Sequence, residues 1–371
     1  RRRYGCSTRN VGPADSLTPT GGESDDGQIV LNNEGHIAMS GAPTKNVEDF
    51  AKRFLAGIVG QETSIERLVD APSGLSVPEM LSALGHPSLG RLGIQLMADF
   101  MHPTNSRYFD AIYGSFFGQK DIRAWLVPTM AQIEFIDFVP TQEPAFLDDG
   151  EGTTSVDEWQ MFANMAAIGA GEGTIPLSKG VSVRRYRDGW ITWACDVYDT
   201  GSFRTPPPDG SEAAPIPDSP SPAEWDRDER TRVTVCSEVD FEADCQQFHP
   251  TDSVYIDPIF GEFHGRDEIT AWIMDIMPRV GNIEFVPVGP ELNDGSVYVQ
   301  EWVQTAVTST GARVPMTRGT SVRRYRDGST VYAADYFDTA TLTRPEVLAA
   351  SRDCGSTVKV DDIMRYRMRG A

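Results

Sequence analysis

The chain has 371 residues, with 33 Lys and Arg against 54 Asp and Glu, which gives a formal net charge of −21 at pH 7. A surface this acidic repels the phosphates of nucleic acids, so we expect no nucleic acid partner. No apolar run approaches the length needed to cross a bilayer, so we expect no membrane partner either.

The first part of the chain is predicted to contribute no core of its own. Residues 1–42 are rich in Gly, Ser, Thr, Asn and Asp and have little hydrophobic periodicity, which predicts a disordered tail. In residues 43–84, Phe50, Phe54 and Ile58 have helical spacing, and Asn46 can cap the N-terminus of the helix. We therefore expect an N-terminal helical segment ahead of the folded domains.

The rest of the chain is organised by a duplication. The string Ser-Val-Arg-Arg-Tyr-Arg-Asp-Gly occurs at 182–189 and again at 321–328. Its flanks agree in the same order, since Val-Tyr-Asp-Thr at 197–200 corresponds to Tyr-Phe-Asp-Thr at 336–339. This shared order predicts two copies of one domain of about 115 residues each, the size of an independent domain. We place the copies at 85–204 and 231–345.

A linker joins the two copies, and a tail follows the second. Residues 205–230 contain seven prolines among acidic and small residues, which predicts a stiff, extended connection. Residues 346–371 contain a short helical pattern around 347–350 and a basic end, and we expect them to form a C-terminal tail.

Each copy begins with a helical pattern and continues with strand patterns. Ile269 and Trp272 lie on one helical stripe in the second copy, as Ile122 and Trp125 do in the first. Runs rich in Val, Ile, Tyr and Thr follow, broken by hairpin turn signals such as Asp-Gly at 327–328. This order predicts an α+β domain in which helices cover one face of an antiparallel sheet.

Four motifs of the second copy together resemble a known family. They are Val-Tyr-Ile-Asp-Pro at 254–258, Phe-His-Gly-Arg-Asp-Glu-Ile at 263–269, the duplicated string at 321–328 and Asp-Tyr-Phe-Asp at 335–338. In this order they are similar to the SnoaL-like branch of the nuclear-transport-factor-2-like superfamily. The resemblance implies two cone-shaped α+β barrels, each with a curved antiparallel sheet wrapped on helices. Because domains of this superfamily pair through their open sheet faces, it also implies an intramolecular pseudo-dimer.

The resemblance also implies a type of chemistry. Enzymes of the superfamily include polyketide cyclases, ketosteroid isomerase and scytalone dehydratase, which move a proton with a buried carboxylate or histidine, usually without metal or cofactor. Burial raises the pKa of a carboxylate toward the working pH, so that the group becomes a usable base for a proton beside a carbonyl.

The first candidate catalytic pair is Asp257 and its counterpart Asp110. The base of ketosteroid isomerase follows a short strand and precedes a proline, and the matching position here is Asp257, which precedes Pro258. An Asp at such a place can also shape a turn by capping the next segment through its side chain. Both interpretations remain open at this point.

The second candidate catalytic pair is Asp335 and its counterpart Asp196. In the cyclases a carboxylate on the last strand faces the pocket, and these two residues match that position. The alternative is a structural carboxylate paired with a neighbouring arginine, for example Arg324 or Arg185.

Six further residues are candidate substrate contacts: Tyr255, Tyr108, Trp302, Trp159, Ser321 and His264. The second carboxyl of ketosteroid isomerase aligns with Ser321, whose hydroxyl can still donate to an enolate oxygen, as can Tyr255. His264 has no histidine counterpart in the first copy, which marks either the one active copy or drift at a surface turn.

The five cysteines predict neither a metal site nor a disulfide framework. They are scattered and odd in number, and none has metal-ligand spacing. We therefore expect reduced thiols, a cytoplasmic location and no cofactor.

Two functions follow from these patterns. We expect a cofactor-independent lyase or isomerase (a cyclase, dehydratase or double-bond isomerase) that acts on a hydrophobic polyketide-like or terpenoid small molecule through carboxylate acid/base chemistry. The alternative is a non-catalytic small-molecule-binding or assembly protein with two degenerate SnoaL-like domains. In either case the two copies are expected to pair within the chain, and a further homo-oligomer is open.

Overall fold

The computed structural model describes residues 30–31, 37–38, 94, 97–133, 135–167, 169, 171–201 and 234–358. The chain divides into a unit of Arg1–Arg53 and a unit of Phe54–Ala371. In the first unit the described elements are strands β1 (Val30–Leu31) and β2 (Ile37–Ala38), which pair with each other. The rest of the predicted tail, the predicted helical segment at 43–84 and the linker at 205–230 lie outside the described residues. Both copies of the duplicated domain lie in the second unit.

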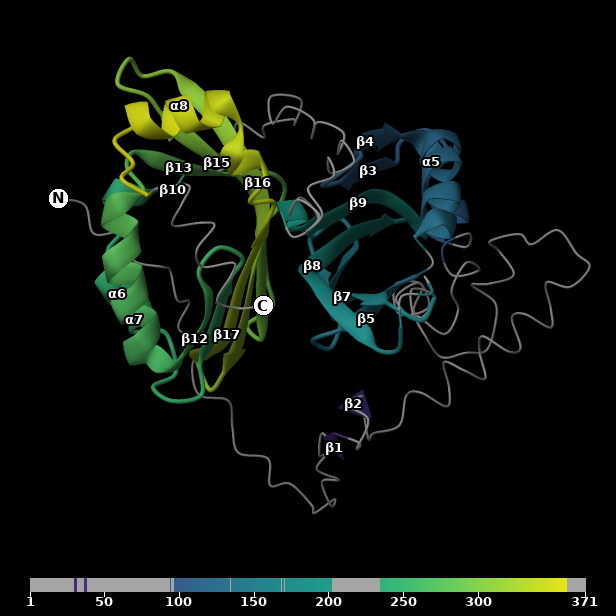
Figure 1. Ribbon diagram of the computed structural model, residues 1–371, viewed down its shortest axis with the longest axis horizontal. Coiled ribbons are helices and arrows are strands. Elements are labelled where there is room, and N and C mark those ends of the chain that lie inside the picture. Colours follow the sequence, from purple (N-terminus) through teal and green to yellow (C-terminus); the bar gives the residue numbers. More distant parts are fainter. Residues whose placement is uncertain are drawn as a thin grey trace, which may run out of the picture. The chain divides into compact units, whose positions relative to one another are not determined.

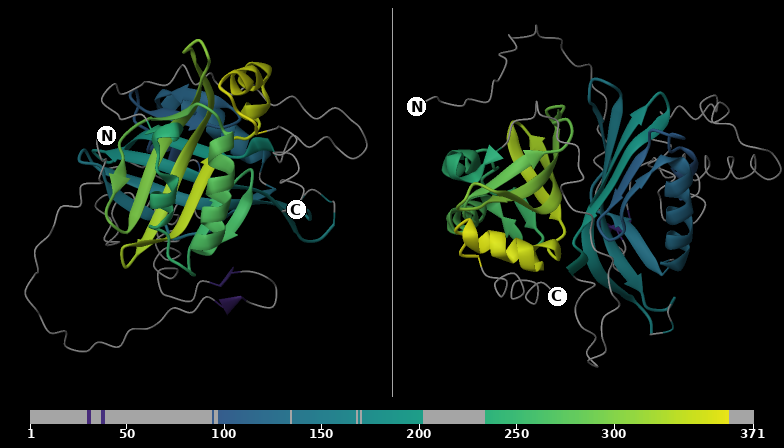
Figure 2. Two further views of the ribbon diagram at one scale, coloured as in Figure 1. Left: turned by 90° about the vertical axis from the view of Figure 1, so that its left-hand side faces the viewer. Right: turned by 90° about the horizontal axis from the view of Figure 1, so that it is seen from above.

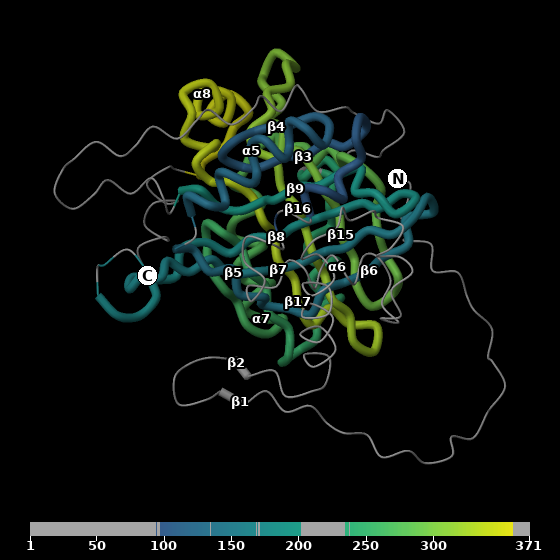
Figure 3. Tube along the Cα trace, turned by 90° about the vertical axis from the view of Figure 1, so that its right-hand side faces the viewer, coloured from purple at the N-terminus to yellow at the C-terminus, as the bar shows by residue number. Residues whose placement is uncertain are grey.

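Among its described residues, the first copy contains helix α5 and a mixed sheet. Its elements are β3 (Arg107–Asp110), β4 (Gly114–Phe117), α5 (Gly118–Gln132), β5 (Ile136–Pro140), β6 (Ala145–Asp148), β7 (Thr153–Asn164), β8 (Thr174–Arg187) and β9 (Trp190–Tyr198). The strand order is β4-β3-β9-β8-β7-β5, and β6 pairs with β7 (Figure 1). Figure 3 views this copy from its helical side and shows α5 in front of the strands, near β3 and β4.

The second copy repeats this arrangement of helix and strands. Its strands are β10 (Thr234–Val235), β11 (Val254–Asp257), β12 (Gly261–His264), β13 (Ile283–Pro287), β14 (Leu292–Asn293), β15 (Val297–Val307), β16 (Arg313–Arg326) and β17 (Ser329–Phe337). Its helices are α6 (Phe241–Cys245), α7 (Gly265–Ile276) and α8 (Pro345–Asp353), with single 3-10 turns at Cys236–Glu238, Met277–Arg279 and Thr341–Thr343. The strand order β10-β13-β15-β16-β17-β11-β12 matches that of the first copy, and α7 lies across one face of the sheet (Figure 2).

The predicted α+β class is confirmed, with one difference in the order of elements. We expected helices first and an antiparallel meander after them, but the hairpin β11–β12 precedes α7 and pairs β11 in parallel with β17. The hairpin β3–β4 does the same beside β9. Strand β11 is only four residues long, so it carries too few alternations to be separated from a turn by pattern alone.

Alternation along the central strands decides which side chains enter the domain interior. On β17, Ala333 packs in one core with Ile269 of α7, whereas Ala334 and Tyr336 pack in a core on the opposite face. Because side chains alternate along a strand, Asp335 lies on the helix-facing side with Ala333. The same rule places Tyr255 and Asp257 of β11 on that side.

The entry into each main helix depends on a glycine. Gly265 has φ +73°, and a Cβ there would lie 3.1 Å from the carbonyl oxygen of Pro250. Gly118 of the first copy has φ +74° and the same distance to the oxygen of Pro103. Both positions combine a left-handed backbone with a close backbone approach, which only glycine meets without strain. The duplicated Gly therefore fixes the angle between hairpin and helix in both copies.

The two sheets share a core on the faces that point away from the helices. It joins residues of both copies: Phe109, Ala145, Leu147, Val156, Val181, Val183, Cys195, Val197, Leu292, Val297, Val299, Val322, Ala334 and Tyr336. The duplicated Asp-Thr pairs exchange bonds across this face. Thr200 Oγ1 donates to Asp338 Oδ1 at 2.7 Å, and Thr339 Oγ1 donates to Asp199 Oδ1 at 2.6 Å. Reciprocal contacts of this kind are typical of a two-fold interface and support the pseudo-dimer that the resemblance implies.

Candidate active site

The candidate active site of the second copy is built on the helix-facing side of four strands. Strand β11 carries Tyr255 and Asp257, β17 carries Asp335, β16 carries Ser321, and β15 carries Trp302. Ser321 and Asp335 are direct cross-strand partners, and β11 runs in parallel on the other side of β17. Predicted site residues that lie up to 80 positions apart in the sequence are therefore brought together by the sheet.

Asp335 is the centre of a hydrogen-bond network. Its carboxylate accepts from the Tyr255 hydroxyl through a short bond, and from Ser321 Oγ at 2.6 Å. The Trp302 indole donates to Ser321 Oγ at 2.8 Å, so the one proton of this hydroxyl is directed toward Asp335. Burial and the negative charge of Asp335 raise the pKa of Tyr255 well above its usual value. Asp335 is therefore an acceptor of hydrogen bonds from two neighbouring hydroxyl groups.

The arginine beside Asp335 is not the one we expected. Arg323 Nη1 and Nη2 both lie 3.2 Å from Asp335 Oδ1, and its guanidinium lies 5.2 Å from the centre of the Tyr255 ring. Arg324, the predicted structural partner, instead donates to Glu158 of the first copy at 2.7 Å. The reason is the two-residue period of a strand, which sends neighbouring arginines to opposite faces. The same correction applies to Arg185, which pairs with Glu301.

Asp257 caps a turn, and it also has the burial expected of a catalytic base. Its Oδ1 accepts from the backbone N–H of Ile259 at 2.7 Å and of Phe260 at 2.9 Å, so it does shape the turn after β11. It is also buried, and burial, with a further contribution from the charge of Asp335, raises the pKa of Asp257 to about 7. Both of these hydrogen bonds run to Oδ1. A carboxylate with this pKa can accept a proton near neutral pH.

Aromatic side chains form the wall between Asp257 and the helix. Trp272 of α7 stacks on Phe263 with ring centres 4.5 Å apart and lies 4.9 Å from the Tyr255 ring. Its indole N–H is buried and has no hydrogen-bond partner among the described residues. An unpartnered buried donor is costly, and it is available to an oxygen atom of a ligand. The sequence places Trp272 on an amphipathic stripe, but such a stripe does not show where an indole nitrogen points.

The first copy has the same network in the same positions. Tyr108 donates to Asp196 through a short bond, Ser182 Oγ donates to Asp196 at 2.6 Å, and Trp159 donates to Ser182 at 2.9 Å. Asp110 accepts from two backbone N–H groups, as Asp257 does, and burial with the charge of Asp196 raises the pKa of Asp110 to about 7.

The two networks differ by one hydroxyl group. The Tyr198 hydroxyl lies 3.2 Å from both carboxylate oxygens of Asp110. The corresponding residue of the second copy is Phe337, which has no group to donate. Asp110 is therefore held on both oxygens, whereas Asp257 is bonded through one. This difference follows from the aligned pairs Val-Tyr-Asp-Thr and Tyr-Phe-Asp-Thr, but the sequence did not show that the second residue of each faces this carboxylate.

His264 is not brought together with the other site residues. It ends β12 and caps α7, its side chain is 61% exposed, and its Nε2 lies 3.2 Å from Glu262 Oε1. The histidines before each duplicated Pro-Thr are turn acceptors. His249 Nδ1 accepts from the backbone N–H of Asp252 at 3.1 Å, and His102 Nδ1 from that of Asn105 at 2.9 Å. Within the described ranges, no group of three His, Cys, Asp or Glu side chains could hold a metal ion.

Comparison with known families covers the second copy. The family described as SnoaL-like domain matches residues 231–333. These residues form a SnoaL-like domain. The first copy has the same elements in the same order as this SnoaL-like domain, so the chain carries the fold twice. No curated protein matches the chain at the significance used for the other comparisons. In the part of the chain that the structure describes, no helix has the length and apolar character needed to cross a membrane.

Several solved structures are similar to the chain over one copy. An NTF2-like protein of unknown function from Burkholderia pseudomallei K96243 is 22% identical and has a TM-score of 0.24, with 28% of this chain and 82% of that chain covered. A protein with a ketosteroid isomerase-like fold from Catenulispora acidiphila DSM 44928, in complex with trimethylamine, is 21% identical with a TM-score of 0.25, covering 32% and 85%. TerC co-crystallised with polyporic acid is 19% identical with a TM-score of 0.24, covering 28% and 82%.

Proposed function

We propose that this protein is a cofactor-independent lyase or isomerase whose active site is the Asp257–Asp335 network of the second copy. The observation that carries the proposal is the state of Asp257, a buried carboxylate with a pKa raised to about 7 beside a second carboxylate, Asp335, that accepts hydrogen bonds from Tyr255, Ser321 and Arg323. A buried carboxylate whose pKa is raised toward neutrality is typical of acid/base sites.

The proposed reaction begins at a carbon beside a carbonyl group of the substrate. Asp257 accepts a proton from this carbon, and the electrons of the C–H bond form an enolate. The buried Trp272 N–H, which has no partner of its own, donates to the enolate oxygen. Asp257 then returns the proton to another carbon in an isomerisation, or the enolate expels a leaving group in an elimination.

The other groups of the network have a positioning role in this proposal. The Tyr255 and Ser321 hydroxyls donate their hydrogen bonds to Asp335 and are therefore not free to act on a substrate. These hydrogen bonds fix the position of the Asp335 carboxylate beside Asp257. The charge of Asp335 makes Asp257 a stronger base. The aromatic rings of Trp272 and Phe260 favour a hydrophobic, polyketide-like or terpenoid carbonyl compound as substrate.

Proton abstraction can be tested without knowledge of the final product. Hydrophobic ketones are incubated with the full chain in D2O, and deuterium uptake beside the carbonyl is followed by NMR. We expect Asp257→Asn to slow uptake by about 100-fold or more, which is the usual contribution of a positioned general base. Asp110→Asn is the matched control and should change uptake less than about twofold, because its carboxylate is already bonded on both oxygens.

The Asn variant keeps the acceptor oxygen for Ile259 and Phe260, so the turn after β11 should persist. Equal uptake by wild type and Asp257→Asn would show that Asp257 is not the base. The second candidate function is non-catalytic binding, which is favoured by the stacking of Trp272 on Phe263 and of Trp125 on Phe116 between helix and sheet. It predicts no deuterium uptake with any ketone, together with a retained small molecule in native mass spectrometry.

A further inference from the structure

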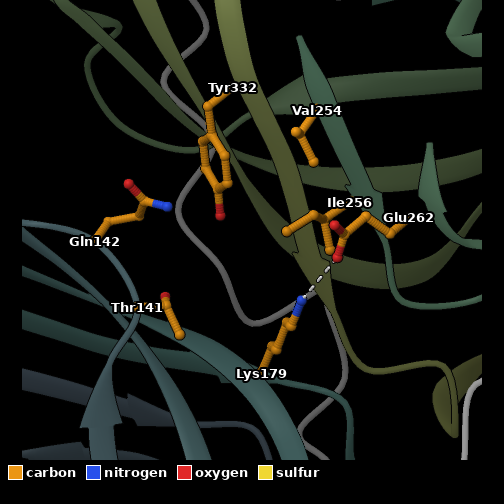
Figure 4. A pocket seen from close by; sticks show the side chains of 7 residues that line it. All are labelled: Thr141, Gln142, Lys179, Val254, Ile256, Glu262 and Tyr332. Atoms are coloured by element: carbon orange, nitrogen blue, oxygen red, sulfur yellow. Dashed lines mark ion pairs between the residues drawn. The ribbon is translucent and has the colours of Figure 1, made fainter. Parts of the chain in front are cut away.

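A hollow lies on the opposite face of the sheet from the candidate active site. It has a volume of about 290 Å³ and is lined by Thr141, Gln142, Lys179, Val254, Ile256, Glu262 and Tyr332. Figure 4 shows the Tyr332 hydroxyl and the Gln142 amide facing into it, with the Lys179–Glu262 ion pair at one side. Val254, Ile256 and Tyr332 alternate with the active-site residues of β11 and β17, so the sheet separates the two sites.

The two-fold counterpart of this hollow is filled. By the duplicated registers, Lys179 corresponds to Arg318, and Tyr332 corresponds to Trp193. The Arg318 side chain is 2% exposed, its guanidinium lies 4.8 Å from the Trp193 ring, and its Nη2 donates to Glu301 Oε1 at 2.7 Å. Lys179 instead lies 40% exposed and makes a 3.5 Å ion pair with Glu262. The hollow therefore exists where an inward arginine is replaced by an outward lysine.

The hydrogen-bond direction at Tyr332 decides what the hollow offers a ligand. The Tyr336 hydroxyl donates its one proton to Glu158 Oε2 at 2.6 Å. The Tyr332 and Tyr336 hydroxyls lie 3.1 Å apart and Tyr332 also interacts with Glu158, so the one proton of Tyr332 is used within this buried cluster. The lone pairs of the Tyr332 oxygen are then left as acceptors, and Glu262 adds a carboxylate at the rim. The polar groups of the hollow thus favour a ligand that donates hydrogen bonds.

We propose that this hollow binds the guanidinium or amidinium group of a small molecule, in the place that the Arg318 side chain takes at the other end of the interface. The planar cation donates to Tyr332 Oη and to the Glu262 carboxylate, and its flat face lies on Ile256. Lys179 is released to solvent when Glu262 accepts the ligand, which costs little because an exposed ion pair contributes about 0–1 kcal/mol.

Binding is tested with ethylguanidinium chloride as the probe and the full chain as the protein. Saturation-transfer NMR at millimolar probe measures contact and affinity, with ethylammonium chloride at equal ionic strength as the control cation. We expect ethylguanidinium to bind at least about fivefold more tightly than ethylammonium, because a planar fork makes two directed bonds where an ammonium acts as a point charge.

Three variants localise the binding to this hollow. The double variant Lys179→Arg/Tyr332→Trp recreates the filled end and should abolish the saturation transfer. Tyr332→Phe keeps the ring but removes the acceptor, and should weaken binding about fivefold or more, the loss expected for one charge-assisted hydrogen bond. Lys179→Ala leaves the hollow open and should bind the probe as well as the wild type or better.

Equal binding of the two cations, or unchanged binding in Tyr332→Phe, would overturn the proposal. If the double variant does not fold, the contrast between Tyr332→Phe and Lys179→Ala still decides, because neither adds volume to the interface.

Discussion

The two copies of this protein share one hydrogen-bond scaffold and differ in single groups placed against it. Trp-to-Ser-to-Asp chains and Tyr-to-Asp bonds are the same in both, whereas Tyr198 of the first copy faces Asp110 and Phe337 of the second faces the corresponding region near Asp257. At the interface, Arg318 fills one end and Lys179 leaves the other open. The two copies thus keep the same buried network, and these differences lie in a few side chains placed around it or at the interface.

The largest difference in the free energy of unfolding is expected between variants of Arg318 and Lys179, which occupy equivalent positions at the interface of the two copies. Arg318→Ala removes one partner of the buried Glu301 and should lower the free energy of unfolding by about 3–5 kcal/mol. Lys179→Ala removes half of an exposed ion pair and should change it by less than about 0.5 kcal/mol. Urea unfolding at pH 7.5 measures both. Equal effects would mean that the two ends are alike, contrary to their different burial.

The buried aspartates should make stability depend on pH in the same way in both copies. The pKa of Asp257 and of Asp110 is about 7 in the folded chain and 3.8 without burial, so the folded chain holds protons that the unfolded chain has lost. Stability therefore falls as the pH rises from about 4 to about 7, by on the order of 2–4 kcal/mol for each residue. Asp257→Asn and Asp110→Asn should each remove the part of this pH dependence that its aspartate causes. Urea unfolding at pH 4.5 and 8 measures the change in the free energy of unfolding. A pH dependence unchanged in both variants would contradict the raised pKa values.

Adding the Tyr198 hydroxyl to the second copy, through Phe337→Tyr, should make the surroundings of Asp257 resemble those of Asp110 and lower activity. Phe337→Tyr places a donor where Tyr198 stands in the first copy, which should lower the pKa of Asp257 and occupy its second oxygen. We expect deuterium uptake to fall about tenfold, a change of about 1.4 kcal/mol, because the second oxygen of Asp257 is then occupied. Tyr198→Phe should leave uptake unchanged. A loss of uptake in Tyr198→Phe instead would assign the activity to the first copy.

The smallest effect is expected where the copies are most alike. Thr200→Val and Thr339→Val each remove a hydroxyl that donates to an Asp of the other copy, and each should lower the free energy of unfolding by about 1 kcal/mol. Because the two bonds are related by the pseudo-two-fold axis, the two costs should be similar. Urea unfolding of the single and double variants checks this, and a cost at only one position would break the symmetry.

Much of the site could be predicted from the sequence, but its partners could not. Asp257, Asp335, Tyr255, Ser321 and Trp302 were identified from motifs and do converge on one face of the sheet. The choice of Arg324 over Arg323 was wrong, although counting alternate residues from Ser321 on the same strand would have found the correct one. The sequence could not predict that the Trp272 indole N–H lacks a partner, since the orientation of a side chain is set by its packing.

The sequence by itself determined the duplication, the α+β class and the hairpin turns, because these depend on local patterns and on the order of elements. The turn at Asp327-Gly328, for example, has positive φ angles of 52° and 76°, which Asp tolerates and Gly adopts without strain. Only the tertiary structure decided that Tyr198 holds Asp110, that Arg318 fills one end of the interface and that Lys179 leaves the other open. The contacts Tyr198–Asp110, Lys179–Glu262 and Arg318–Trp193 join residues about 80 to 125 positions apart. Their geometry depends on how whole sheets twist and pack, which no local pattern specifies.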